Sequence, residues 1–290
     1  MPITSADLQF EYYIVCVLDL LNQQEKLKGW SKLPSATSPD PNFIKAVKET
    51  VGTVNWFRQA FVDFFHQADQ VNLSPQQLSN LSEQGLEQFR RYRECALKTL
   101  HFSDTFVFYA PLRNSHGDYS LSALYRIITA CSMAMLVALA AKVPVRGGIA
   151  IGTGTVLDDG DFYGPALARA HHLESKEARY PRILVDEEVL QILGNRFSSD
   201  NITDKISHAL ARECEFFICR GSDQKWMVDF LGKAARKMAQ GGIVKMEVVE
   251  SVAAFVQREY DSFKDVGNEK LQSRYKLLLD YVTERLPIWR

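Results

Sequence analysis

Two aspartates stand where carboxylates could hold metal ions. Asp19 follows Tyr12–Leu18, an aromatic and β-branched run that is short enough for a buried strand. Asp104 ends the run His101–Asp104, which we expect to connect two strands as a hairpin. If the sheet sets these strands side by side, both carboxylates meet at one edge. Close carboxylates repel unless a cation lies between them, and two metals about 3.5–4 Å apart can stabilise both oxygens of a phosphoryl transfer.

Each aspartate alone has a simpler interpretation. We expect a helix to begin at Asp19, where an Asp is commonly a cap beside free N–H groups that also favour phosphate. An Asp in a turn, such as Asp104, usually serves the turn itself. The two residues therefore need a further signal before they indicate a site.

That signal is the glycine-rich segment Val145–Ile183. Its three glycines, Gly147, Gly148 and Gly152, let a backbone or ligand approach a strand closely. Tyr163–Pro165 ends a hairpin and leads into a helix that carries Arg169 and His172. Residues three apart share one helix face, so this pair predicts a polar wall for a triphosphate.

Three stretches resemble the class III nucleotidyl cyclases. They are VCVLDLL around Asp19, SDTFVFY around Asp104, and the block RGGIAIG…YGPALARAHHLES…YPRI, which is the most specific. The likeness is closest to the pyrimidine (uridylate or cytidylate) cyclases of bacterial Pycsar anti-phage systems, and it covers roughly half of the chain.

The resemblance implies that Asp19 and Asp104 hold two Mg²⁺ or Mn²⁺ ions, with help from the backbone carbonyl of Leu20. It places Lys98 where the family has a base-reading side chain. The helix after Gly164 would orient the ribose and stabilise the phosphorane. The implied reaction is that of a phosphorus–oxygen lyase, which converts UTP or CTP into a 3′,5′-cyclic nucleotide and pyrophosphate in anti-phage defence. The resemblance also implies a homodimer with two composite sites.

Some positions depart from the family. The usual Asn and Arg of that helix fall on Ala168 and His172, and the usual Gly-Phe after the first metal Asp falls on Asn22-Gln23. Candidates for the missing cation are Arg169, Arg146 and Arg182. These departures fit a non-purine base, and they also fit lost activity.

Composition excludes some classes of protein. Lys and Arg number 34 against 35 Asp and Glu, so no global basic field would attract nucleic acid. The five scattered cysteines show no zinc spacing and suit a reducing cytosol. The start lacks the pattern of a signal peptide. The apolar stretch Ile127–Ala141 is shorter than the ~20 residues of a membrane span, so we predict a core helix in a cytoplasmic protein that does not contact a membrane.

The order of expected elements predicts an α/β (α+β) fold, a ferredoxin-like class III cyclase core with a mixed or antiparallel sheet. We assign residues 1–230 to a catalytic domain with a helical insertion at about 31–96, and residues 231–290 to a C-terminal helical extension packed on it. Within the insertion we expect a loop over Ser31–Asn42 and helices over Phe43–Ala68 and Pro75–Lys98, the second starting at Asn72–Pro75. We interpret the aromatic residues Trp56, Phe57, Phe61, Phe64 and Phe65 as core, and Arg90, Arg91 and Arg93 as a solvated helix face.

Two rival functions remain open. The first is a catalytically degenerate cyclase-fold module that binds a nucleotide and dimerises. The retained aspartates argue against this function, and the missing Asn and Arg argue for it. A palm-type polymerase or diguanylate cyclase shares the core and the carboxylates, but the chain has no GGDEF-like or adjacent double-Asp hairpin. The sequence alone does not choose among the four bases.

Overall fold

The computed structural model describes residues 10–28, 40–68, 82–114, 116–117, 119–157, 160–194, 202–239 and 245–290. The expected helix start at Asn72–Pro75, Asp159 of the expected turn and most of the expected loop Ser31–Asn42 lie outside these residues.

A single sheet organises the chain. Its strands lie in the order β2-β3-β1-β4-β6-β8-β7, and β5 pairs with β4. The strands are β1 (Glu11–Leu20), β2 (Lys98–Phe102), β3 (Thr105–Pro111), β4 (Val145–Val156), β5 (Phe162–Tyr163), β6 (Ile183–Val185), β7 (Ile218–Arg220) and β8 (Trp226–Val228). The pair β4 and β6 is parallel and the other described pairs are antiparallel. The predicted α+β fold with a mixed sheet is therefore confirmed.

The first four strands form the part of the sheet that carries the candidate site. Along the chain they run β1, helices, β2, β3, a helix, β4, and in space they lie β2-β3-β1-β4. This is the split β-α-β arrangement of ferredoxin-like folds. It makes β1 a central strand, hydrogen-bonded to β3 on one side and β4 on the other.

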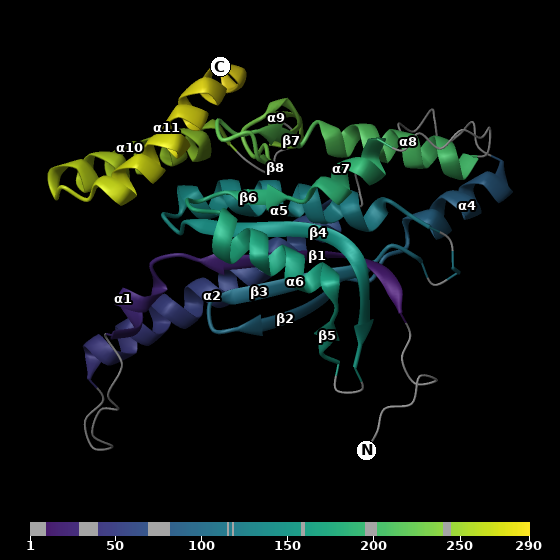
Figure 1. The fold of residues 1–290 in the computed structure, drawn as a ribbon, viewed down its shortest axis with the longest axis horizontal. Helices are drawn as coiled ribbons and strands as arrows, with labels where there is room; N and C mark the ends of the chain where they lie inside the picture. The colour runs from purple at the N-terminus through teal and green to yellow at the C-terminus, as the bar shows by residue number, and fades with distance from the viewer. Residues whose placement is uncertain are drawn as a thin grey trace.

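Helices lie on both faces of the sheet, and Figure 1 shows α6 in front of it and α5 behind. The helices are α1 (Gln23–Leu27), α2 (Pro41–Gln67), α4 (Glu83–Arg93), α5 (Ser122–Ala140), α6 (Pro165–His172), α7 (Glu187–Gly194), α8 (Ile202–Glu215), α9 (Lys233–Met238), α10 (Met246–Asp265) and α11 (Glu269–Trp289). A π-helical turn, Leu173–Glu177, continues α6. Local sequence sets several of these starts: Asp40 accepts from the Asn42 N–H at 2.8 Å ahead of Pro41, which opens α2.

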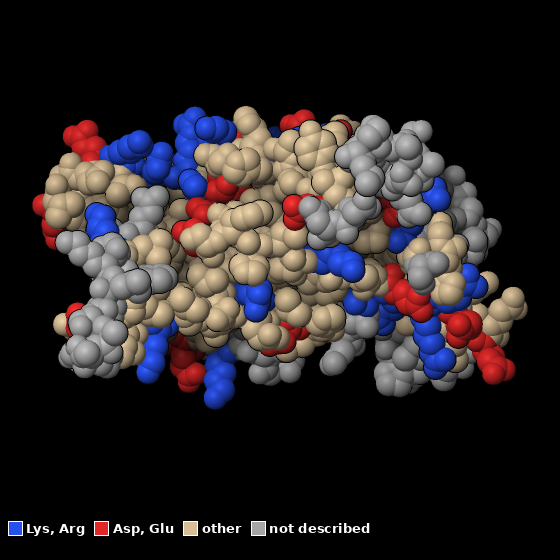
Figure 2. Space-filling view, turned by 90° about the horizontal axis from the view of Figure 1, so that it is seen from below, with Lys and Arg blue, Asp and Glu red and all other residues tan. Residues whose placement is uncertain are grey.

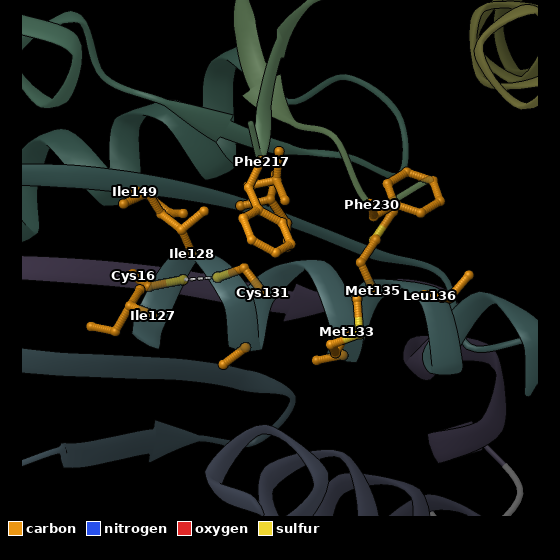
Figure 3. Packing of buried hydrophobic residues seen from close by; sticks show 14 of the residues in the cluster. Cys16, Ile127, Ile128, Cys131, Met133, Met135, Leu136, Ile149, Phe217 and Phe230 are labelled. Carbon is orange, nitrogen blue, oxygen red and sulfur yellow. Dashed lines mark hydrogen bonds between the residues drawn. The ribbon is translucent and has the colours of Figure 1, made fainter. Parts of the chain in front are cut away.

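Alternation along β1 divides its side chains between two cores. Ile14, Cys16 and Leu18 face the larger core, which α2 and α5 cover, whereas Tyr13 and Val15 face a smaller one beneath α6. Figure 3 shows Cys16 of β1 beside Cys131 of α5, with their sulfur atoms 3.3 Å apart. The C-terminal helices α10 and α11 add buried residues to the larger core. The proposed boundary near residue 230 stays a prediction.

Helix α5 contains the apolar stretch whose length raises the question of a membrane span. It is long and apolar enough to cross a bilayer, but 89% of its apolar window is buried inside the protein. The expected core helix is therefore confirmed.

Helix α2 presents an aromatic row to the sheet. Phe57, Phe61 and Phe65 recur every four residues and are fully buried, and the Phe61 ring stacks on Phe108 of β3 with ring centroids 3.7 Å apart. Trp56 is partly exposed, so the core interpretation holds for the Phe row and not for Trp56.

Two expectations about local structure are wrong, and one helix is absent from the predicted elements. The helix expected to reach Lys98 ends at Arg93, because Glu94 turns extended and Lys98 already pairs with Tyr109 in the β2–β3 hairpin. Asp19 does not begin a helix: β1 runs through it to Leu20, and α1 starts only at Gln23, after Asn22 adopts a left-handed φ of 66°. Helix α8 was not expected at all.

Replacing Phe61 by Ala should lower the free energy of unfolding by about 3–5 kcal/mol, because it removes a buried ring stacked in a close-packed core. The exposed Phe216 is the matched control, and Phe216→Ala should change stability by less than about 0.5 kcal/mol. Denaturant titration measures both. Equal losses would mean that the α2–sheet contact is not part of the folded core.

Candidate active site

The structure brings Asp19 and Asp104 together. Asp19 pairs with Thr105 in β3, and Asp104 is the residue before Thr105 in the tight turn between β2 and β3. Ser103 takes a left-handed φ of 57° there, which closes the hairpin. The Leu20 N–H donates to the Asp104 carbonyl at 3.1 Å. The N–H groups of Leu20 and Leu21 therefore form hydrogen bonds with backbone carbonyls. They are not available to bind phosphate, whereas the expected helix start would have left them available.

Two neighbouring side chains hold the Asp19 carboxylate. The Thr105 hydroxyl donates to Oδ1 at 3.0 Å, and Arg146 of β4 contacts Oδ2 through Nη2 at 3.1 Å and Nε at 3.2 Å. Burial raises the pKa of Asp19, Arg146 and Thr105 oppose that rise, and the negative charge of Asp104 adds to it. The carboxylate is thus fixed in direction but short of positive charge.

Glu174 is a third carboxylate of this cluster. Its Oε1 forms an ion pair with Arg146 Nε at 2.7 Å, although the aligned hydrogen bond from Nε points to Asp19. Its Oε2 lies 3.4 Å from His171 Nδ1. Burial raises the pKa of Glu174, and the charge of Asp19 raises it further while Arg146 opposes. Arg146 therefore links β1 and β4 to the turn after α6.

A glycine makes this approach possible. A Cβ added at Gly148 would meet the Ala170 carbonyl oxygen at 2.4 Å and the Leu173 Cβ at 2.5 Å. Only a residue without a side chain lets α6 lie this close to β4. The predicted reason for a glycine in this strand, close approach of another backbone, is confirmed at Gly148.

Arg169 lies elsewhere in the same chain. Its guanidinium contacts Asp186 at 3.3 Å, Glu188 and the Ile151 carbonyl, and it lies over Gly152. Gly152 is six residues along β4 from Arg146, which corresponds to about 20 Å of strand. Within one chain, Arg169 therefore does not reach Asp19.

His172 is exposed and lies 3.2 Å from Glu177, through Nε2 and Oε1. Although His172 and Arg169 are three apart on α6, their acidic partners differ. The polar wall that the sequence predicts consists of two side chains that each already have a counter-charge.

The remaining predicted residues have separate places. Lys98 is exposed at the first position of β2, at the far end of the hairpin from the Ser103–Asp104 turn. Arg182 is buried, donates to both Asp223 oxygens at 2.9 and 2.7 Å and lies over the Tyr180 ring. This geometry makes Arg182 a structural tie between segments and unsuited to a transition-state cation. The Leu20 carbonyl as a metal ligand stays a prediction.

The donor set suits a hard divalent cation. Carboxylate and carbonyl oxygens are what Mg²⁺ and Mn²⁺ prefer. The described residues contain no group of three or more His, Cys, Asp and Glu placed to hold a metal ion, so binding here would depend on the carboxylate pair and on carbonyl oxygens. Asp19 and Glu174 share one guanidinium, that of Arg146, and Asp104 adds a further negative charge near Asp19, so added positive charge would be favourable. Asp19 and Asp104 are the residues that could hold the ions.

Sequence reasoning missed Glu174. It lies in the LES part of the resembling block, but nothing in its spacing predicts that Arg146, 28 residues earlier, would reach it. No model of a known protein family matches the chain, and no curated protein matches it.

The metal-free protein should become more stable when Asp19 is replaced by Asn. Because the pKa of Asp19 is higher in the folded state than in the unfolded state, protonated Asp19 favours the folded protein. The contribution of Asp19 to the free energy of unfolding therefore falls as pH rises through the folded-state pKa and the group ionises. Asn copies the neutral form, so in EDTA at pH 7 the Tm of Asp19→Asn should exceed that of the wild type by a few degrees, and the gap should shrink toward pH 4. Thermal unfolding across this range measures it. A lower Tm at pH 7 would contradict the assigned electrostatics.

Proposed function

We propose that the chain is a metal-dependent nucleotidyl cyclase that converts a nucleoside triphosphate into a 3′,5′-cyclic nucleotide and pyrophosphate. One observation carries the proposal: Asp19 in β1 and Asp104 in the β2–β3 turn, far apart in the sequence, converge at one end of the β1–β3 ladder of a split β-α-β core. The resemblance in the sequence assigns this pair to metal binding, and the geometry supports that assignment.

The chain itself supplies positioning. Thr105 and Arg146 fix the direction of the Asp19 carboxylate, and the Leu20 N–H fixes the backbone of Asp104. Two divalent ions bound there would lower the pKa of the ribose 3′-hydroxyl and neutralise the leaving pyrophosphate. The 3′-hydroxyl would lose its proton to water as its oxygen bonds to the α-phosphorus, and the bond from that phosphorus to the bridging oxygen would break to release pyrophosphate. Such a reaction needs orientation and charge more than covalent help from the protein.

A homodimer with composite sites accounts for the place of α6. Arg169 does not reach Asp19 within one chain and His172 contacts Glu177, but a two-fold partner could bring its own α6 opposite the carboxylates. Two exposed aromatic side chains support such a contact: Phe102, 69% exposed, beside the Asp104 turn, and Tyr163, 72% exposed, just before α6. Pyrimidine substrates, UTP or CTP, a cytoplasmic setting and a role in anti-phage defence complete the proposal on the resemblance alone.

The second candidate is a degenerate cyclase-fold module that binds a nucleotide without turnover. It is favoured by the acidic partners that Arg169 and His172 already have, and by Ala168 in place of Asn. Metal-dependent turnover separates the two candidates.

Incubation of the protein with each of UTP, CTP, ATP and GTP and Mn²⁺ should yield a cyclic product from at least one pyrimidine nucleotide, detected by mass. Asp104→Ala should lower the rate by at least about 100-fold, because one metal-holding carboxylate is gone. Asp265→Ala on α10, an exposed and distant site, should keep the wild-type rate. Unchanged turnover in Asp104→Ala would refute the site, and no product from any nucleotide would favour the binding module.

The dimer has its own test. Light scattering should give about twice the 32.9 kDa mass of one chain, and Tyr163→Asp should give the mass of a monomer together with loss of cyclisation. Val266 is the control, since it is 71% exposed at the α10–α11 connection and Val266→Asp should change neither property. A monomer with full activity would contradict composite sites.

A further inference from the structure

A cavity lined by four arginines lies at the other end of the β1–β3 ladder. Its volume is about 830 Å³, and the arginines that line it are Arg90, Arg93, Arg113 and Arg126. Glu11, the first residue of β1, and Pro111, the last of β3, also line it. Asp19 is eight residues further along β1, about 26 Å away, so the cavity is separate from the candidate active site.

The lining of this arginine cavity combines cationic and apolar residues. Two glutamates, Glu11 and Glu94, accompany the four arginines, and Glu94 Oε2 lies 3.4 Å from His116 Nε2 outside the cavity lining. Among the lining residues that the structure describes, the arginines outnumber the acids. Phe89, Cys95, Ala96 and Pro111 supply apolar surface. A ligand that combines an anionic group with an organic part matches both kinds of lining residue.

The cationic wall is built before any ligand arrives. Arg126 is only 7% exposed, its guanidinium lies over the Phe65 ring at 5.4 Å, and its Nη2 donates to the Arg93 carbonyl at 3.0 Å. The Arg93 guanidinium lies over the Phe89 ring at 5.1 Å. Planar guanidinium groups held on aromatic faces keep their direction, which favours anion binding because little freedom is lost.

The frame of the cavity is also fixed. Three carbonyls at the end of α4 accept hydrogen bonds from outside the helix: that of Arg91 from Asn114 Nδ2 at 2.7 Å, that of Tyr92 from the Ser120 hydroxyl, and that of Arg93 from Arg126. These bonds tie the end of α4 to the chain after β3 and to α5. The sequence predicted a solvated face for this arginine cluster, but two of its members, Arg90 and Arg93, line the cavity.

We propose that the arginine cavity binds a phosphorylated small molecule with two or more negative charges. Arginine forks match phosphate oxygens in geometry and charge, and the volume lies in the range of small-molecule sites. A nucleic acid is disfavoured, because Lys and Arg number 34 against 35 Asp and Glu, and the face in Figure 2 intersperses the two kinds of charge. This site lies beyond the proposed cyclase reaction and does not depend on it.

Calorimetric titration of the full chain with sodium tripolyphosphate, in EDTA so that no metal-dependent triphosphate site forms, tests the proposal. We expect one saturable site per chain. Arg90→Glu and Arg113→Glu, at two exposed positions, should each weaken binding by at least about tenfold. Arg258→Glu on α10 makes the same charge change on a distant exposed residue and should leave the affinity within about twofold.

Asp19→Asn should also bind tripolyphosphate normally, so a failed cyclase and a failed anion site give different results. Thermal unfolding checks that each variant is folded, and Arg90→Gln replaces Arg90→Glu if the latter is not. Absence of saturable binding would overturn the proposal. So would equal weakening by Arg258→Glu, which would show a general charge effect. Tighter binding of a single-stranded RNA that the cavity variants weaken would also overturn it.

Discussion

The contact of Arg146 with Asp19 and Glu174 is the interaction on which the candidate site depends. It joins the central strand β1, the neighbouring strand β4 and the turn after α6 through one guanidinium. It requires Gly148, because any side chain there would push α6 off the strand. With Asp19 held in this way, the β2–β3 hairpin brings Asp104 beside it, and the two carboxylates share one end of the sheet.

This arrangement is electrostatically unfavourable without a further cation. Burial raises the pKa of both Asp19 and Glu174, and the charge of a neighbouring carboxylate raises each pKa further. Arg146 opposes the rise in both residues. Structural ion pairs usually lower the pKa of an acid, as Arg182 does for Asp223 in this chain. The contrast marks the Asp19 cluster as a place where stability is given up, which is common where function requires it.

The sequence could predict what depends on local pattern. The burial of alternate residues in β1, of the Phe row in α2 and of the apolar run in α5 follows from their sequence patterns. The glycines of β4 predict the close approach of a backbone, which occurs at Gly148. The sequence could not predict features set by distant segments. Leu20 stays in the sheet because Asp104 and Pro144 accept the N–H groups of Leu20 and Leu21. Glu174 lies in the site because it contacts Arg146 of β4, and Arg169 lies outside it because it contacts Asp186. The arginine cavity likewise needs α4, α5 and the chain after β3 together.

The most direct measurement is electron paramagnetic resonance of Mn²⁺ titrated into the protein with a non-cleavable triphosphate analogue. A two-metal site at Asp19 and Asp104 predicts about two bound ions per active site, magnetically coupled because they lie about 3.5–4 Å apart. Asp104→Asn should lose at least one ion and the coupling. Uncoupled Mn²⁺ that binds equally to the wild type and to Asp104→Asn would contradict the account.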